Sequence, residues 1–140
     1  MHLFIDTNVV IDYLADRQPF SEHAAEIFNY AEQGRISIHI SGVSYNNIYY
    51  LLRQSLTHIA TIKILDEIAE MTHITEVNEA VIKKSLKSDF KDFEDAIQYN
   101  CALLVPKLKA IVSRNIKDFK NSTVAVLSPT EVVAMINSEK

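Results

Sequence analysis

Residues 2–6 read His-Leu-Phe-Ile-Asp and are followed directly by Thr7 and Asn8. A short apolar run stopped by an acid is typical of a buried strand that ends at a polar edge of a sheet. Asp6, Thr7 and Asn8 carry the side-chain chemistry that caps the first turn of a helix, and apolar residues continue the helix to Leu14. The stretch therefore predicts a strand, a polar junction and a helix, which is the opening unit of an α/β fold.

The same alternation of strand and helix patterns continues along the chain. Short β-branched or alternating runs predict strands at residues 35–41, 73–77, 110–113 and 124–127. Apolar residues at helical spacing predict helices at residues 21–33, 44–54, 57–71, 78–86, 129–136, and from 89 or 92 to 104. Gly34 is placed to end the helix that starts at residue 21. This order predicts a three-layer α/β/α fold with a small, mostly parallel sheet covered on both faces.

The helix over residues 57–71 has one stripe that is expected to face the core. It consists of Ile59, Ile62, Leu65, Ile68 and Ala69. The aromatic residues Phe20, Tyr49 and Tyr50 are candidates for an exposed surface, but tyrosines at helical spacing favour the core.

The length and composition are those of one globular domain. The chain has 140 residues, of which 48% are hydrophobic and 23% are charged. A chain of this size is expected to bury about 68% of its extended surface on folding. No repeat, low-complexity tract or linker interrupts it, so a single domain over residues 1–140 is expected.

Cysteine usage and hydropathy indicate a cytoplasmic protein. The single cysteine, Cys101, lies among apolar residues and is expected to be a buried small hydrophobe in a reducing compartment. The N-terminus has no basic, secretory-type segment. No uncharged run approaches the ~18 apolar residues of a membrane helix, so no membrane contact is expected.

Only two glycines, Gly34 and Gly42, occur in the chain. This excludes the glycine-rich loops that hold dinucleotides and nucleoside triphosphates. Any phosphate must then be held by side chains or metal ions.

The charge is unevenly distributed. The net charge is −4, but residues 1–80 carry 4 basic against 11 acidic residues, and residues 81–140 carry 10 against 7. The acidic total argues against non-specific coating of nucleic acid, yet it allows a local basic rim. The alternative is a solvated helix face with a chance excess of lysine.

Polar residues follow two of the predicted strands. In parallel sheets, ligands bind beyond the carboxyl ends of the strands. Asp6 follows Leu3-Phe4-Ile5, and Ser113-Arg114-Asn115 follows Ala110-Ile111-Val112, with Asp118 three residues further on. The alternative roles are a helix cap for Asp6 and a turn for the second group.

A third acidic cluster comprises Asp89, Asp92, Glu94 and Asp95. The helix dipole favours acids in a first turn, which explains Asp92 and Glu94. It explains Asp95 less well, because Asp95 shares a face with Gln98 beside the inward stripe of its helix.

Three acids from separate segments at one sheet edge are suited to Mg²⁺ or Mn²⁺, which bind oxygen ligands and keep several waters. Two such ions can stabilise both oxygens of an in-line phosphoryl displacement. The histidines show no metal-binding spacing and are expected to be structural: His2, His23, His39, His58 and His73. No nucleophile elbow and no Cys/His zinc pattern is present.

Three motifs in order resemble the PIN-domain nucleases, which include VapC-type toxins of bacterial toxin–antitoxin pairs. They are Phe4-Ile5-Asp6-Thr7-Asn8-Val9, Asp92-Phe93-Glu94-Asp95-Ala96, and Val112-Ser113-Arg114-Asn115-Ile116-Lys117-Asp118-Phe119. The resemblance runs from about residue 2 to residue 135 and implies a metal-dependent RNA phosphodiesterase. Asp6 and Asp95 match the most dependable metal-binding acids, and Asn115 or Asp118 matches the last, more variable one. Thr7, Asn8, Asp92 and Ser113 are supporting positions.

One departure from the family pattern concerns the helix after the second strand. The family usually has a glutamate there, whereas this chain reads Ser44-Tyr45-Asn46-Asn47-Ile48, and Asn47, or else Asn46, takes the place. The chain resembles a subgroup in which asparagine is usual. An amide oxygen can bind a metal but brings no charge and cannot act as a general base, so weaker metal affinity is expected than in a four-acid site.

Three functions follow as hypotheses. The first is a Mg²⁺- or Mn²⁺-dependent endoribonuclease, with catalytic Asp6, Asp95 and Asp118, and with Lys91, Arg114, Lys117 and Lys120 on the RNA backbone. As a toxin it would have an antitoxin partner, and the resemblance implies a homodimer. The second is a weak or inactive PIN-like module that binds RNA or protein. The third, a small-molecule phosphatase, lacks a phosphate-binding motif of its own.

Overall fold

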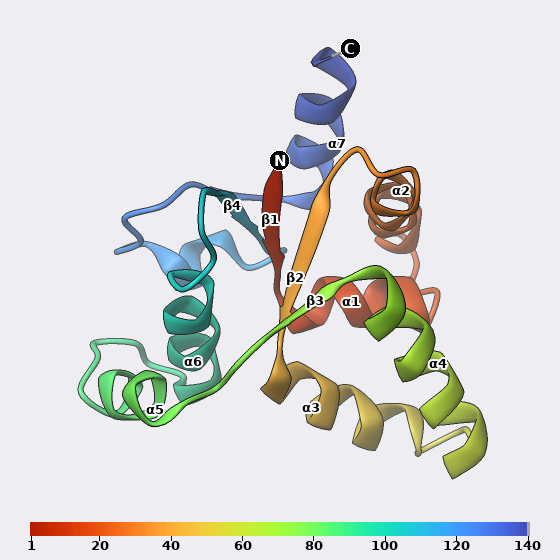
Figure 1. Cartoon of the computed structure of the whole chain (residues 1–140), viewed down its shortest axis with the longest axis horizontal. Coiled ribbons are helices and arrows are strands. Elements are labelled where there is room, and N and C mark those ends of the chain that lie inside the picture. The colour runs from red at the N-terminus through yellow and green to blue at the C-terminus, as the bar shows by residue number, and fades with distance from the viewer. Residues whose placement is uncertain (140) are drawn as a thin grey trace.

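The computed structural model describes residues 1–139, in which five strands form one sheet (Figure 1). The strands are β1 (His2–Ile5), β2 (Ser37–Ser41), β3 (His73–Thr75), β4 (Leu108–Val112) and β5 (Val126–Leu127). Their order across the sheet is β3-β2-β1-β4-β5, and every pairing between them is parallel. The predicted parallel α/β sheet is confirmed, although β3 and β5 are shorter than the patterns indicated.

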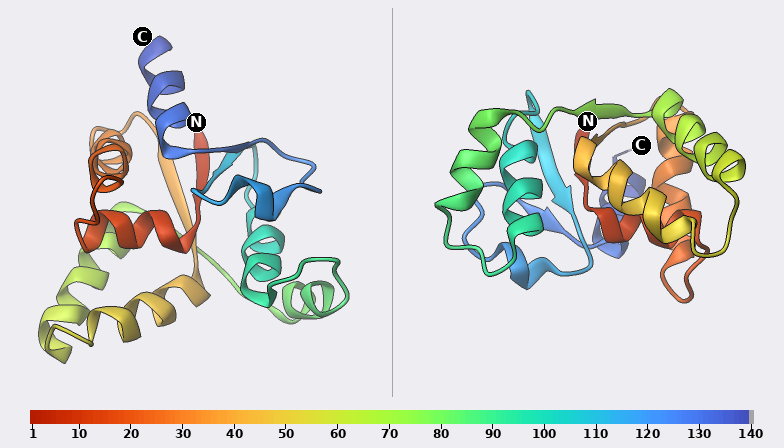
Figure 2. Two further views of the ribbon diagram at one scale, coloured as in Figure 1. Left: turned by 180° about the vertical axis from the view of Figure 1, so that it is seen from behind. Right: turned by 90° about the horizontal axis from the view of Figure 1, so that it is seen from below.

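Helices cover both faces of this sheet (Figure 2). One face carries α1 (Thr7–Leu14), α2 (Ser21–Glu32), α3 (Gly42–Leu52), α4 (His58–Met71) and α7 (Pro129–Ser138). The other face carries α5 (Glu79–Leu86) and α6 (Phe93–Ala102). A short 3₁₀ helix, η1 (Ile116–Phe119), follows β4. The three-layer α/β/α arrangement is therefore confirmed.

The central strand β1 is buried on both faces, as its apolar run predicts. Leu3 and Ile5 pack in the larger core cluster with α1, α2 and α7, whereas Phe4 points the other way and packs against α6. All three side chains are fully buried. Since neighbouring strand residues face opposite sides of a sheet, three consecutive apolar residues serve both cores.

Side-chain caps mark the starts of the α-helices other than α2, whose N-cap is Phe20. The Asp6 carboxylate accepts a hydrogen bond from the Thr7 amide at the start of α1, and Asp92 caps α6 by accepting from the Asp95 amide at 3.0 Å. Of the two predicted starts for α6, the structure therefore has the later one. Gly34 follows α2 with a φ of +74°, a left-handed conformation that glycine adopts without strain.

The stripe predicted for α4 is only half correct. Leu65 and Ile68 are buried, but Ile59 is 81% exposed and Ile62 is 45% exposed. The N-terminal half of α4 lies beside the C-terminal end of α3 and extends past the sheet, so it has no sheet face to pack on (Figure 1). For the same reason Tyr50 of α3, which was expected in the core, is 64% exposed.

Cys101 is buried in the α6 core cluster, and burial raises the pKa of its thiol to about 11. This agrees with its expected role as a small hydrophobe. In the described part of the chain, no helix is both long enough and apolar enough to cross a membrane.

Candidate functional site

The topology creates a crevice at the carboxyl ends of β1 and β4. From β1 the chain adds β2 and β3 on one side, whereas β4 and β5 lie on the other, so the order of strands reverses between β1 and β4. In open parallel sheets this switch point is where ligands bind. Asp6 follows β1 and Ser113 follows β4, and the Asp6 amide donates to the Val112 carbonyl oxygen at 2.9 Å.

A cavity of about 520 Å³ opens at this point. Its lining includes all but one of the metal-binding and supporting residues predicted from the sequence, namely Asp6, Thr7, Asn8, Asn47, Asp92, Asp95, Asn115 and Asp118. Ser113 lies fully buried behind it. Asn46, the alternative to Asn47, is exposed and does not line the cavity. We refer to this space as the acidic cavity.

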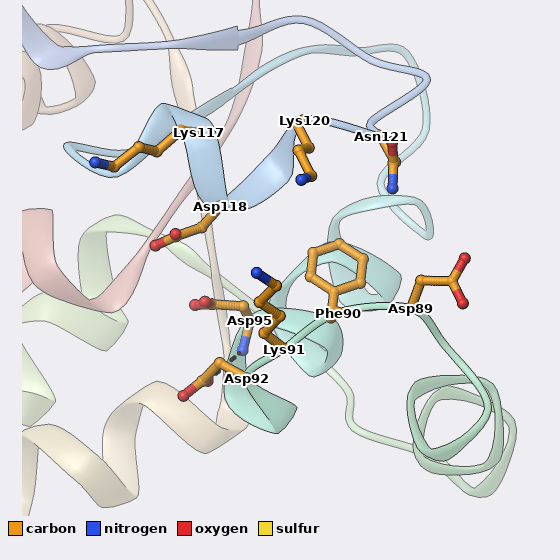
Figure 3. Close-up of a pocket in the computed structure, with 9 residues that line it drawn as sticks. All are labelled: Asp89, Phe90, Lys91, Asp92, Asp95, Lys117, Asp118, Lys120 and Asn121. Atoms are coloured by element: carbon orange, nitrogen blue, oxygen red, sulfur yellow. Dashed lines mark hydrogen bonds between the residues drawn. The ribbon is translucent and has the colours of Figure 1, made fainter.

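A second cavity of about 680 Å³ adjoins the first and shares Asp92, Asp95 and Asp118 with it (Figure 3). Figure 3 shows these three carboxylates at one end, with Phe90 in the middle and Lys120 across from it. Three of the four predicted RNA-binding residues, Lys91, Lys117 and Lys120, line this space. We call it the lysine-lined cavity.

Asp6 is held in one orientation inside the acidic cavity. The Thr7 amide donates to one carboxylate oxygen at 2.8 Å, and the Ser113 hydroxyl donates to the other at 2.7 Å. The side chain is only 6% exposed, and this burial raises the pKa of the Asp6 carboxyl from 3.8 to about 6. The two hydrogen bonds oppose that rise, whereas the negative charges of Glu94 and Asp118 add to it.

Asp95 shows a similar effect. Burial, and then the charge of Asp92, raise the pKa of its carboxyl to about 7, with smaller contributions from Asp6, Asp118 and Glu94. The acidic cavity thus gathers more negative charge than its surroundings neutralise. A bound cation would relieve this repulsion.

The donor set fits a hard divalent cation. The side-chain ligands on offer are carboxylate, amide and hydroxyl oxygens, which suit Mg²⁺ or Mn²⁺. The Asn8 Oδ1 atom is buried without a hydrogen-bond partner in the described structure. Among residues 1–139, no three acidic, histidine or cysteine side chains converge closely enough to enclose an ion by themselves. Mg²⁺ needs only one or two carboxylates, because it keeps several waters.

Two further charged residues line the acidic cavity, Glu94 of α6 and Arg17 of the loop after α1. The sequence patterns did not assign either of them to a site. The position of Glu94 in a first helical turn had a sufficient explanation in the helix dipole. The signal that could have found it is its spacing of four residues from Gln98, which puts both on one helix face. No sequence pattern pointed to Arg17.

Arg114 lies outside both cavities. Its guanidinium forms a two-pronged ion pair with the buried Asp12 of α1, through Nε and, at 3.2 Å, through Nη2. The same group lies 4.0 Å above the centre of the Phe20 ring. These contacts hold the segment after β4 against α1. They also occupy the Arg114 side chain, which was predicted from the sequence to bind RNA.

Comparisons with known proteins show which family the sequence matches. A family model described as "PIN domain" matches residues 2–117 of the chain. "Ribonuclease VapC1" of Aquifex aeolicus (strain VF5) is 27% identical over 129 residues, which cover 82% of this chain and 87% of that protein.

Solved structures are similar in fold. A toxin–antitoxin complex from Klebsiella pneumoniae matches with a TM-score of 0.67 at 22% identity, over 91% of this chain and 97% of that one. VapBC-1 from nontypeable Haemophilus influenzae matches with a TM-score of 0.67 at 17% identity, over 93% of this chain and 99% of that one. At these identities the likeness shows the fold alone. Because the family model spans most of the sequence and the structure has the matching fold, the chain belongs to the PIN domain family.

Proposed function

We propose that the protein is a Mg²⁺- or Mn²⁺-dependent endoribonuclease. The observation that carries the proposal is the meeting of Asp6, Asp95 and Asp118, from three separate segments, in one acidic cavity that continues into a lysine-lined one. A pair of cavities of this kind offers oxygen ligands for a cation beside cationic groups for a phosphate backbone.

In this proposal Asp6 and Asp95 are the main metal ligands. Asp118 is favoured over Asn115 as the last one, because its charge acts on both Asp6 and Asp95. When bound, a divalent cation supplies positive charge that stabilises the transition state of phosphodiester hydrolysis. The Ser113 hydroxyl and the Thr7 amide hold Asp6 in the orientation that ligand binding requires.

The lysine-lined cavity would bind the RNA chain. Lys91, Lys117 and Lys120 can neutralise backbone phosphates beside the acidic cavity. Phe90, which packs on Tyr99 and Phe119 at ring-centre distances of 5.3 and 6.0 Å, lines the same space. A base of single-stranded RNA could stack on it.

Cleavage of RNA by the purified protein in Mn²⁺ tests this function. Asp6→Asn and Asp95→Asn should each abolish cleavage, whereas the matched control Asp66→Asn, at an exposed position on α4, should cleave like the wild type. Cleavage that survives in both site variants would overturn the proposal.

A toxin role adds protein partners to the proposal. The likeness to toxin–antitoxin complexes supports an antitoxin that blocks the acidic cavity. The proposed homodimer gains support from the exposed apolar side chains at the end of the α3–α4 pair, which are Tyr50, Leu56, Ile59 and Ile62. Sedimentation equilibrium should then give twice the 15.9 kDa chain mass. The monomer mass at micromolar concentration would contradict the dimer.

The second candidate is a PIN-like module that binds RNA or protein without cutting. It is favoured by one observation, the uncharged Asn47 where the family usually has an acid. Calorimetry with Mn²⁺ separates the two candidates, because a non-catalytic module would bind RNA while showing no metal binding at millimolar concentrations.

A further inference from the structure

Glu94 lies in the first turn of α6 and lines the acidic cavity together with Asn47 of α3. We propose that Glu94 supplies the metal site with the carboxylate that α3 lacks, and that Asn47 is a positioning residue that orients Glu94 rather than a metal ligand. The inference rests on the proposed metal-dependent function.

The carboxylate of Glu94 is held through one of its two oxygens. Oε2 accepts a hydrogen bond from Asn47 Nδ2 at 2.7 Å and another from the Thr7 hydroxyl at 3.2 Å. The amide that replaces the expected acid therefore donates a proton to a carboxylate from another helix. The other oxygen, Oε1, has no hydrogen bond within the described structure and is free to take a ligand.

A buried polar network lies beneath Glu94 and supports these hydrogen bonds. Gln98 and Ser44 are fully buried, and Gln98 Nε2 donates to both the Thr7 and the Ser44 hydroxyl at 2.9 Å. The two hydroxyl oxygens are 2.6 Å apart. With Gln98 Nε2 as the donor to both hydroxyls, the Ser44 hydroxyl can donate to Thr7 and the Thr7 hydroxyl to Glu94.

In this arrangement both hydroxyls accept from the Gln98 amide, and their own protons are directed along the chain from Ser44 through Thr7 to Glu94 Oε2, which accepts. The Gln98 Oε1 atom is buried without a hydrogen-bond partner in the described structure.

The consequence for the metal site is a change in its charge. Asn47 contributes no charge, and the sequence alone therefore predicts weak metal binding. With Glu94, five carboxylates line the acidic cavity, those of Asp6, Asp92, Glu94, Asp95 and Asp118. The acid that α3 lacks is supplied by α6, next in sequence to Asp95.

Mn²⁺ titration calorimetry on the wild type, Glu94→Gln, Asn47→Ala and the double variant tests this assignment. Glu94→Gln should weaken Mn²⁺ binding at least about 10-fold, because glutamine keeps an acceptor oxygen for the network but loses the charge. Asn47→Ala should weaken binding less. The double variant should bind no more weakly than Glu94→Gln alone, because Asn47 acts through Glu94.

Two results would overturn the inference. One is that Glu94→Gln binds Mn²⁺ as tightly as the wild type. The other is that the fold-losses in Mn²⁺ affinity of the two single variants multiply in the double variant, as expected if Asn47 were an independent ligand. Glu67→Gln, at an exposed position on α4, is the matched control, and thermal unfolding checks that each variant is folded. Failure of the wild type itself to bind Mn²⁺ and to cleave RNA would instead refute the proposed function.

Discussion

Replacing Asp6 with asparagine is expected to make the metal-free protein more stable while removing metal binding. Burial raises the pKa of the Asp6 carboxyl from 3.8 to about 6. Ionised Asp6 therefore lowers the free energy of unfolding of the metal-free protein. Each pKa unit corresponds to 1.36 kcal/mol, and the cost is therefore about 3 kcal/mol once the group is ionised in both states.

The neutral asparagine escapes this cost and keeps most of the local hydrogen bonds. Its Oδ1 can still accept from the Thr7 amide at the start of α1, and its Nδ2 faces the Ser113 hydroxyl, which can accept instead of donating. Allowing for imperfect geometry there, we expect a gain of about 2 kcal/mol, or about 4–8 °C in the melting temperature of a chain of this size.

The pH dependence of the gain identifies its cause. An acid whose pKa is raised on folding destabilises the protein above its unfolded pKa, and this cost disappears as pH falls. The difference between Asp6→Asn and the wild type should hence be full above pH 6, shrink between pH 6 and 4, and vanish below pH 3.8.

Urea unfolding in EDTA at pH 8, 6.5 and 5 measures this difference, with Asp66→Asn as the exposed control. An Asp6→Asn variant that is no more stable than the wild type at pH 8 would show that burial of the Asp6 charge does not destabilise the fold. A gain in stability that is the same at all three pH values would likewise show that charge burial is not its cause.

Three other predictions concern the site and its scaffold. Burial and acidic neighbours raise the pKa of Asp95 to about 7. Calorimetry should therefore find that Mn²⁺ affinity rises between pH 5.5 and 7.5 as protons leave the site, and an affinity independent of pH would contradict a role of Asp95 as a metal ligand. Asp12→Ala leaves the partly buried Arg114 unpaired and should cost about 3 kcal/mol in urea unfolding, and a loss below 1 kcal/mol would contradict the structural role of the pair. Ser128→Ala removes the capping box with Glu131 at the start of α7 and should lower stability by about 1 kcal/mol, measured by thermal unfolding; no change would show that the cap is dispensable.

Much of the fold can be predicted from local patterns. The run Leu3-Phe4-Ile5 predicts a strand buried on both faces, and the structure has β1 at the centre of the sheet. Cap residues such as Asp6 and Ser128 mark helix starts, because their hydrogen bonds reach only to the next turn. The α4 stripe went wrong at Ile59 and Ile62, since periodicity shows which face of a helix is apolar but not how far the sheet beneath it extends.

The candidate site could be predicted in outline. The rule that ligands bind at strand ends selects Asp6 and Ser113, and the three motifs add Asp95 and Asp118; the structure places them together at the switch point. The pairing of Glu94 with Asn47 could not be predicted, because the two residues are 47 positions apart and meet only when α3 and α6 pack around the crevice.

The sequence by itself determined the succession of strands and helices along the chain, the starts of most helices and the acids that follow the strands, because these depend on interactions within a few residues. The tertiary structure alone decided the long-range pairings. It joins Arg114 to Asp12, and it brings His2 and His39, which show no spacing pattern, to 2.9 Å between ring nitrogens on neighbouring strands. Such contacts follow from the strand order and register, which no stretch of local sequence specifies.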